Sequence, residues 1–254
     1  MAEGRDINKA VLATRGLTRR FGGLIAVRDV SIALLGGELH AVIGPNGAGK
    51  TTLVSLLAGD LRPSEGHIVL EGRDVGSEPM WRRTHLGIGR SFQRTNIFPT
   101  LSALENVRLG AQAVAKPRNP LRAAGGEEDL MERANGALAR VGLSGVATRT
   151  AGALSHGEQR QLEIAMTLAG EPKVLLLDEP LAGMGPEESE RLTGLLKELA
   201  REHAILLIEH DMDFVFAVAD WMTVMAEGAI LAEGRPDAIR ANRQVQDAYL
   251  GGHA

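Results

Sequence analysis

The sequence predicts an α/β fold with a parallel sheet at its centre, an antiparallel β subdomain at its N-terminal end and an inserted α-helical subdomain. Three aliphatic runs lack polar alternation and end in polar residues, which predicts buried parallel strands. The runs are HAVIG (40–44), VLLLDE (174–179) and AILLIEH (204–210). Helical patterns cover 51–58, 186–202 and 212–219. Strands that alternate with helices are typical of a sheet covered on both faces.

The segments outside this alternation have other patterns. Up to Leu35, short β-prone pieces (AVLATRGL, DVSIALL) are separated by glycine-containing turns, which predicts an antiparallel subdomain. Between Gln93 and Leu154, apolar residues recur at helical spacing on both sides of the Pro/Gly-rich loop AKPRNPLRAAGG. We therefore expect a single domain over 1–254. Within it, 1–92 and 166–254 form the core with the β subdomain, and 93–165 form the helical subdomain.

Composition excludes several classes of protein. The chain has 254 residues, 44% of them hydrophobic, and a net charge of −4, so it suits a globular domain and offers no basic field for nucleic acid. The absence of cysteine excludes disulfides, thiolate metal sites and cysteine nucleophiles. The polar N-terminus has no secretory signal, and the tract FVFAVADWMTVMA is too short to span a bilayer. Membrane association is therefore expected only through a partner.

A phosphate-binding motif follows the first aliphatic run. GPNGAGKT matches G-x-x-x-x-G-K-[ST] and lies where a strand passes into a helix, as that motif requires. Its backbone N–H groups wrap phosphate oxygens, Lys50 reaches the β- and γ-phosphates, and the Thr51 hydroxyl is a magnesium ligand. The strand-to-helix context disfavours the alternative of a glycine-rich turn with a surface lysine. The predicted nucleotide-binding residues here are Gly44, Pro45, Asn46, Gly47, Ala48, Gly49, Lys50, Thr51 and Thr52.

Polar residues also end the other two aliphatic runs. Asp178 and Glu179 follow the second run, and His210 ends the third. Because the carboxyl ends of parallel strands meet at one edge, we expect these side chains to converge on the phosphate-binding loop. Asp178 is then a magnesium ligand, and Glu179 orients and deprotonates an attacking water. Helix capping or exposure to solvent is the alternative for the two carboxylates, and a structural or surface histidine is the alternative for His210.

The stretch LSHGEQRQLEIA (154–165) supports two interpretations. Ser155 and Glu158 fit the capping box of a helix start. The backbone N–H groups near Gly157 could also bind a phosphate that this chain does not otherwise hold. The two interpretations are compatible, because a capped helix still presents donors at its N-terminus.

Together these motifs resemble the ATP-binding subunits of ABC transporters over nearly the whole chain. They occur in the family's order: Walker A GPNGAGKT, the Q-loop Gln93 in GRSFQ, the signature LSHGEQ (154–159), Walker B VLLLDE, and the switch His210 in IEHD. The resemblance implies a P-loop NTPase core of the ABC ATPase type, with ATP and Mg²⁺ as cofactors. It also implies a head-to-tail dimer, in which Ser155, Gly157 and Glu158 of one subunit close over the ATP bound to the other.

The resemblance assigns further roles. Glu179, His210 and Gln93 become the catalytic residues, and Gln93 joins Thr51 and Asp178 at the magnesium ion. Phe21 in RRFGG corresponds to the aromatic residue that stacks on adenine, although a single Phe at a strand end is usually part of the core.

Departures from the general pattern indicate one branch of the family. His156 replaces a signature glycine, Glu158 replaces the signature glutamine, and Gly185 in LAGMG (181–185) stands in place of the D-loop aspartate. With GIGRSFQ, IEHDMDFV and the C-terminal segment, they resemble the branched-chain amino acid importers. This implies an ATPase on the cytoplasmic face of the membrane, bound to permease subunits and indirectly to a solute-binding protein. Importers of urea, short amides or other solutes and non-transport ABC ATPases remain alternatives, and the second ATPase can be a copy or a paralogue.

The segment after Gln93 predicts a contact with the permease. Ile97 and Phe98 precede Pro99 in a predicted turn, where a large apolar pair is expected to be exposed. Leu101 and Leu104 are expected to be buried at a helix start. We expect Ile97 and Phe98 to line a groove for a cytoplasmic helix of the permease.

Overall fold

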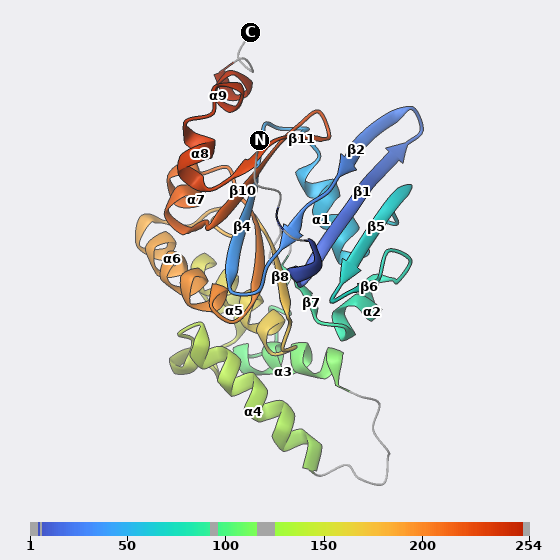
Figure 1. Ribbon diagram of the computed structural model, residues 1–254. Helices are drawn as coiled ribbons and strands as arrows, with labels where there is room; N and C mark the ends of the chain where they lie inside the picture. The colour runs from blue at the N-terminus through green and yellow to red at the C-terminus, as the bar shows by residue number, and fades with distance from the viewer. Residues whose placement is uncertain (1–4, 6, 92–95, 116–124, 251–254) are drawn as a thin grey trace.

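The computed structural model describes residue 5 and residues 7–91, 96–115 and 125–250. Within these residues the centre is a six-stranded sheet in the order β11-β10-β4-β9-β8-β7 (Figure 1). Its strands are β4 (Glu38–Ile43), β7 (Ile88–Arg90), β8 (Val174–Asp178), β9 (Ala204–Ile208), β10 (Trp221–Ala226) and β11 (Ala229–Gly234). All pair in parallel except β11, which is antiparallel to β10. The three predicted strands are therefore confirmed, and they are adjacent.

The aliphatic runs are continuous because each strand is buried on both faces. In β8, Leu175 and Leu177 pack into one hydrophobic core, and Leu176 packs into a second core on the opposite face. The second core contains α1 (Lys50–Ala58), which follows the phosphate-binding loop. The first core contains α6 (Pro186–Ala200) and joins the sheet to the helical part of the chain. α7 (Met212–Val218) packs through Val215 into a third, smaller core with β10.

The antiparallel subdomain extends further along the sequence than its N-terminal strands. Its strands are β1 (Leu12–Phe21), β2 (Leu24–Val30), β3 (Ala33–Leu34), β5 (Glu65–Leu70) and β6 (Arg73–Asp74). The predicted N-terminal pieces are confirmed as antiparallel strands. The sequence did not predict β5 and β6, which follow α1: β5 pairs with β1, and β6 pairs with β5. A short helical turn, η1 (Ile7–Lys9), precedes β1.

The helical part lies at one end of the molecule, opposite the C-terminal helices (Figure 1). It comprises α3 (Ala103–Val114), α4 (Gly125–Arg140), η3 (Ser144–Val146), η4 (Ala151–Ala153) and α5 (His156–Leu168). α5 runs unbroken past residue 165, where we place the boundary of the helical subdomain. At the other end, α8 (Pro236–Arg240) and α9 (Arg243–Leu250) pack against β11. In the described ranges, none of the helices is both long and apolar enough to cross a bilayer.

A buried arginine holds the end of the helix that begins at the phosphate-binding loop. Arg83, on α2 (Met80–His85), is fully buried. Its guanidinium donates to the carbonyls of Leu56 (2.5 Å) and Leu57 (2.9 Å) in α1, and to Gly76 (3.0 Å). Burial lowers the pKa of Arg83 to about 10, so the side chain stays charged at neutral pH. Arg83 thus satisfies carbonyls at the C-terminal end of α1 that lack helical partners.

Replacing Arg83 with alanine is expected to lower the free energy of unfolding by about 2–4 kcal/mol, because it leaves buried carbonyls without donors. Chemical denaturation monitored by circular dichroism measures this change. Arg82→Ala is the matched control, since Arg82 is largely exposed and its loss should matter little. Equal stability of the two variants would contradict this role for Arg83.

Candidate active site

The phosphate-binding loop joins β4 to α1. At two of its positions, only glycine fits both the backbone conformation and the space available. Gly44 has φ +150°, and a Cβ there would lie 2.1 Å from the Met225 carbonyl oxygen. Gly49 has φ +99°, and a Cβ there would lie 2.3 Å from the Ala26 carbonyl oxygen. The loop is therefore packed against β10 and β2, and it delivers the N-terminus of α1 at Lys50. A helix N-terminus behind a glycine-rich loop binds phosphate.

A cleft of about 860 Å³ lies between this loop and the β1–β2 hairpin. It is lined by seven predicted site residues of the loop, Asn46, Gly47, Ala48, Gly49, Lys50, Thr51 and Thr52. Phe21, at the end of β1, and Glu179 line the same cleft. Gly44 and Pro45 are not among its lining residues. The fold thus brings the loop, the predicted adenine-stacking residue and the predicted base together around one space.

Lys50 lies back along its own loop. Its Nζ donates to the carbonyl oxygens of Gly44 (2.6 Å) and Pro45 (3.1 Å). Partial burial lowers the pKa of Lys50, and the charges of Glu179 and Asp178 oppose that shift. The ammonium group therefore lies within electrostatic reach of both strand-end carboxylates.

Asp178 ends β8 and is 2% exposed. Burial raises the pKa of its carboxyl, and the positive charge of Arg90 is the main opposing influence. Arg90 Nη2 lies 3.8 Å from Asp178 Oδ2, and no residue in the described ranges donates a hydrogen bond to this buried oxygen. A buried carboxylate oxygen that lacks donors is costly unless a cation balances it. Asp178 therefore has the character of a metal ligand.

Glu179 has an unusual backbone conformation. Its φ is +50°, a region that side-chain-bearing residues rarely adopt and that recurs at functional sites. Its N–H donates to the Ile208 carbonyl at 2.9 Å, and its own carbonyl accepts from Arg160 Nη2 at 3.0 Å. These contacts fix the turn after β8 from which the half-buried side chain reaches the cleft.

His210 follows β9 and is strongly exposed, with its Nδ1 3.6 Å from Glu209 Oε2. Glu209 itself is buried and accepts from the N–H groups of Leu181 (2.8 Å) and His210 (3.1 Å). Burial raises the pKa of Glu209, and these two hydrogen bonds oppose the rise. Sequence reasoning missed Glu209, whose one signal was a carboxylate directly after an aliphatic strand. It ties the turn after β8 to the turn after β9.

The signature segment lies outside this cleft. Ser155 caps α5: its Oγ accepts from Glu158 N (3.2 Å), and Glu158 Oε2 accepts from Ser155 N (2.7 Å), which confirms the capping box. Ser155 and Glu158 line a separate hollow between α4, α5 and α6. Gly157, whose backbone N–H is another predicted phosphate donor, is buried. The fold therefore does not bring these residues to the phosphate-binding loop of their own chain.

A buried ion pair in α5, also missed at the sequence level, connects this helix to the active site. Arg160 Nη1 lies 2.6 Å from Glu163 Oε2, and both side chains are almost fully buried. The same guanidinium donates to the Glu179 carbonyl. The spacing of three residues between Arg160 and Glu163 was the available signal in the sequence, but exposed ion pairs on helices have the same spacing.

Gln93 falls outside the described residues, so its predicted role stays a prediction. Phe98, just beyond that gap, is 52% exposed, as expected. Ile97 and Leu104 are partly buried and pack against the core of the helical part. The expectation of an exposed apolar pair is therefore correct for Phe98 and wrong for Ile97, which packs against the hydrophobic core.

Comparisons with known proteins agree with this geometry. Residues 27–182 match the family described as ABC transporter, and residues 229–254 match the one described as branched-chain amino acid ATP-binding cassette transporter. The high-affinity branched-chain amino acid transport ATP-binding proteins BraF of Pseudomonas aeruginosa and LivG of Escherichia coli K12 are 39% and 38% identical to this chain. Each match covers 96% of this chain and 99% of the relative.

Among solved structures, the ADP conformation of MJ1267, an ATP-binding cassette of an ABC transporter, is 31% identical to the chain. It superposes with a TM-score of 0.84 and covers 95% of this chain and 98% of its own. The chain therefore matches an ATP-binding cassette in both sequence and fold. The chain belongs to the ABC transporter family, as one of its ATP-binding and ATP-hydrolysing subunits.

Proposed function

We propose that this chain energises the import of branched-chain amino acids by hydrolysing ATP in the cleft between the phosphate-binding loop and β1–β2. The observation that carries the ATPase chemistry is the convergence of Lys50, Thr51 and Glu179 on one cleft. The similarity to BraF and LivG along almost the whole chain, together with the matched C-terminal segment, supports branched-chain amino acids as the solute. A urea or short-amide importer is the alternative within the same branch.

Each of the predicted site residues has its own role in ATP binding or hydrolysis. The loop N–H groups and Lys50 hold the β- and γ-phosphates, and Phe21 stacks on adenine. Glu179 accepts a proton from the water whose oxygen attacks the γ-phosphorus, and the bond to the β–γ bridging oxygen breaks as ADP leaves. His210 is exposed beside this edge of the sheet and contacts the γ-phosphate as charge moves onto it.

The residues present also suit Mg²⁺. Asp178 offers a buried carboxylate oxygen that accepts no hydrogen bond from the part of the chain that the structure describes, and Thr51 offers a hydroxyl at the first turn of α1. No group of three or more His, Cys, Asp or Glu capable of holding a metal occurs among the described residues, but Mg²⁺ needs few protein ligands beside phosphates and waters. We assign Thr51, Asp178 and Gln93 to the ion, which when bound neutralises charge on the β- and γ-phosphates.

The position of the signature segment supports a two-subunit arrangement. Ser155, Gly157 and Glu158 lie away from the chain's own phosphate-binding loop, so a second ATPase subunit supplies the loop whose ATP they meet. The capped N-terminus of α5 offers donors and a favourable dipole to that γ-phosphate. The second subunit is a copy of this chain or a paralogue.

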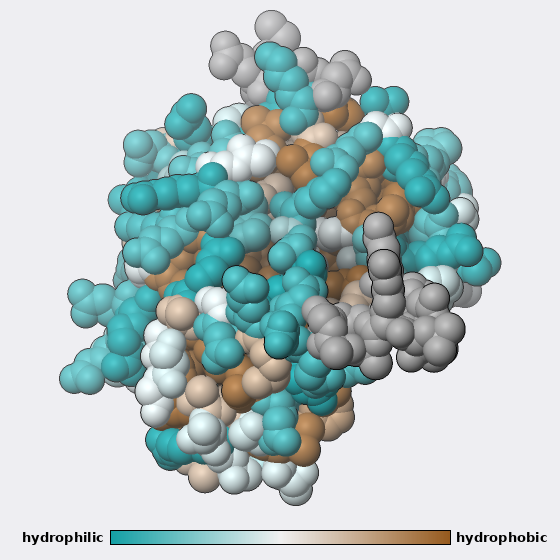
Figure 2. Space-filling model, turned by 90° about the horizontal axis from the view of Figure 1, so that it is seen from below, coloured by the Kyte–Doolittle hydropathy of each residue, from teal (hydrophilic) through white to brown (hydrophobic). Residues whose placement is uncertain are grey.

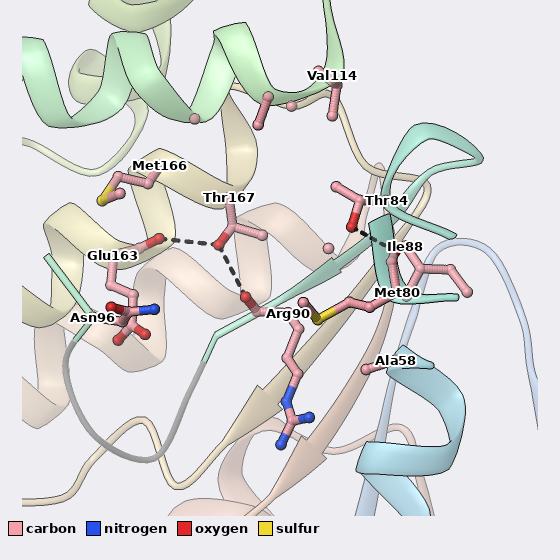
Figure 3. A pocket seen from close by; sticks show the side chains of 14 residues that line it. Ala58, Met80, Thr84, Ile88, Arg90, Asn96, Val114, Glu163, Met166 and Thr167 are labelled. Carbon is pink, nitrogen blue, oxygen red and sulfur yellow. Dashed lines mark hydrogen bonds between the residues drawn. The ribbon is translucent and has the colours of Figure 1, made fainter. Parts of the chain in front are cut away.

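A pocket lined in part by Asn96 suits a segment of the permease. It has a volume of about 220 Å³ and lies between α3, α5, α2 and β7 (Figure 3). Met80, Val114 and Met166 give it apolar walls, and Asn96 and Arg90 add polar groups. Phe98 is exposed two residues beyond Asn96. An amphipathic helix with one apolar face fits such a pocket.

We place the chain at the cytoplasmic face of the membrane, bound through permease subunits. The face seen from below, where α3 and α4 lie, is mainly hydrophilic, with its hydrophobic residues in separate patches (Figure 2). Patches of this kind suit local docking of a protein partner. A solute-binding protein then acts on this chain only indirectly, through the permease.

The proposed function is tested by purifying the tagged chain from its native membranes and reconstituting the attached subunits. Stimulation of ATP hydrolysis by the co-purified binding protein with leucine, isoleucine or valine is the expected result. Stimulation by urea or a short amide instead would show that the chain serves a urea or short-amide importer. Recovery without any membrane subunit would contradict a role in transport.

Phe98→Ala is expected to leave folding and ATP binding unchanged, because the side chain is half exposed and outside the nucleotide cleft. Association with the permease should decline, and solute-stimulated hydrolysis with it, since an exposed aromatic anchor contributes about 1–3 kcal/mol to an interface. Co-purification yield and stimulated ATPase rate measure the effect. Gln244→Ala, which truncates an exposed side chain on α9 at the opposite end of the molecule, is the control. Normal assembly and transport by Phe98→Ala would refute the assignment.

A further inference from the structure

The carboxylate of Glu188 lies directly on the N-terminal end of α5. Glu188 Oε1 is 3.5 Å from Ser155 Oγ. A Cβ built on Gly157 would lie 2.3 Å from the same Oε1 and 2.4 Å from Cδ, so the carboxyl group packs against the Gly157 backbone. Two of the three residues that we assign to the partner's ATP, Ser155 and Gly157, are thus in contact with an acid of their own chain.

Glu188 also caps its own helix. It is the third residue of α6, and its Oε2 accepts from the N–H of Gly185 at 3.1 Å. Gly185 stands where the family has its D-loop aspartate. One carboxylate therefore joins the signature segment to the end of the D-loop segment (181–185).

A second contact between these segments involves another departure from the family pattern. Gly183 has φ +79°, and a Cβ there would lie 3.1 Å from Cε1 of His156. The imidazole thus packs on the D-loop backbone, where a signature glycine would leave space. His156 and Glu188 together hold the N-terminus of α5 against residues 183–185.

We propose that Glu188 is a positioning residue that occupies the signature end of α5 until the γ-phosphate of the partner subunit's ATP displaces it. Both groups are anions that a helix N-terminus attracts, and at contact distance they repel each other. Displacement removes the acceptor of the Gly185 N–H, so arrival of the phosphate also releases the D-loop segment. This inference rests on the proposed function, because it needs the two-subunit arrangement.

The test uses the hydrolysis-deficient Glu179→Gln chain, alone and mixed with any ATPase subunit that co-purifies with it. Light scattering measures the ATP concentration at half-maximal dimerisation. Adding Glu188→Gln removes the charge but keeps an oxygen that can accept from Gly185 N. The substitution is expected to lower this ATP concentration roughly threefold to tenfold. A charge at a helix terminus contributes a free energy of about that size when it is counted at both nucleotide sites of the dimer. Glu187→Gln, an exposed neighbour with the same change of charge, is the matched control and should have no effect.

The outcomes are distinct. If Glu188 is only a structural cap, Glu188→Gln will have a lower melting temperature, but its ATP dependence of dimerisation will equal that of Glu187→Gln. That result would overturn the inference and leave the proposed function standing. Weaker dimerisation of Glu188→Gln would overturn it as well, because the carboxylate would then assist the contact. If the Glu179→Gln chain forms no ATP-dependent dimer in either setting, the two-subunit part of the proposed function fails, and the inference fails with it.

Discussion

Glu179→Gln is expected to bind ATP normally and to lose turnover by roughly 10²–10⁴-fold, because general-base assistance has about that worth. The amide has nearly the same shape as the carboxylate, so the backbone contacts of Glu179 with Ile208 and Arg160 can persist. It cannot accept the proton of the attacking water. ATP should therefore remain intact between two subunits and hold them as a stable dimer.

Equilibrium ATP binding and single-turnover phosphate release separate binding from chemistry in this variant. Glu227→Gln is the matched control, since Glu227 is exposed on the rim of the same cleft and has, like Glu179, a positive φ of +49°. Its turnover should stay within a few fold of the parent chain. Comparable turnover in Glu179→Gln would show that Glu179 takes no part in the chemistry.

Lys50→Ala is expected to weaken ATP binding about 10- to 100-fold, because a hydrogen bond between charged groups contributes about 1.5–3 kcal/mol. Lys50 supplies the ammonium group at the loop, and no other residue of the predicted loop (44–52) carries a positive charge. Isothermal titration with a slowly hydrolysed ATP analogue measures the dissociation constant.

Two controls make the Lys50→Ala result specific. Lys197→Ala removes an exposed lysine near the end of α6 and should leave affinity unchanged. The melting temperature of Lys50→Ala checks that the loop survives the loss of the contacts to Gly44 and Pro45. Unchanged affinity in a folded Lys50→Ala protein would remove the phosphate-binding assignment.

The parts of this molecule that sequence predicts best are those fixed by local pattern. The three aliphatic runs became central strands because alternate residues of each enter different cores, and the phosphate-binding loop followed the first of them. The capping box at Ser155 depends only on residues three apart, so it too was predictable.

The residues that were missed depend on contacts made across the fold. Arg83 reaches carbonyls 26 and 27 residues earlier in the chain, and Glu209 accepts from an N–H 28 residues away. Neither distance leaves a periodic pattern in the sequence. Glu188 would pass for an ordinary acid in the first turn of a helix. Its contact with Gly157 arises only because the fold brings the first turn of α6 to the first turn of α5.

The length and attachment of α5 have a consequence for timing in the transport cycle. The helix has 13 residues and is about 20 Å long. Its first turn carries the signature residues, its last turns carry Met166 and Thr167 in the pocket of Figure 3, and Arg160 pins its middle to Glu179. Leu162, Ile164 and Leu168 bury the helix in the core along its length, so its two ends move together as one rigid body. Under the proposed function, a permease segment that displaces the pocket end of α5 would therefore displace the signature end in the same step.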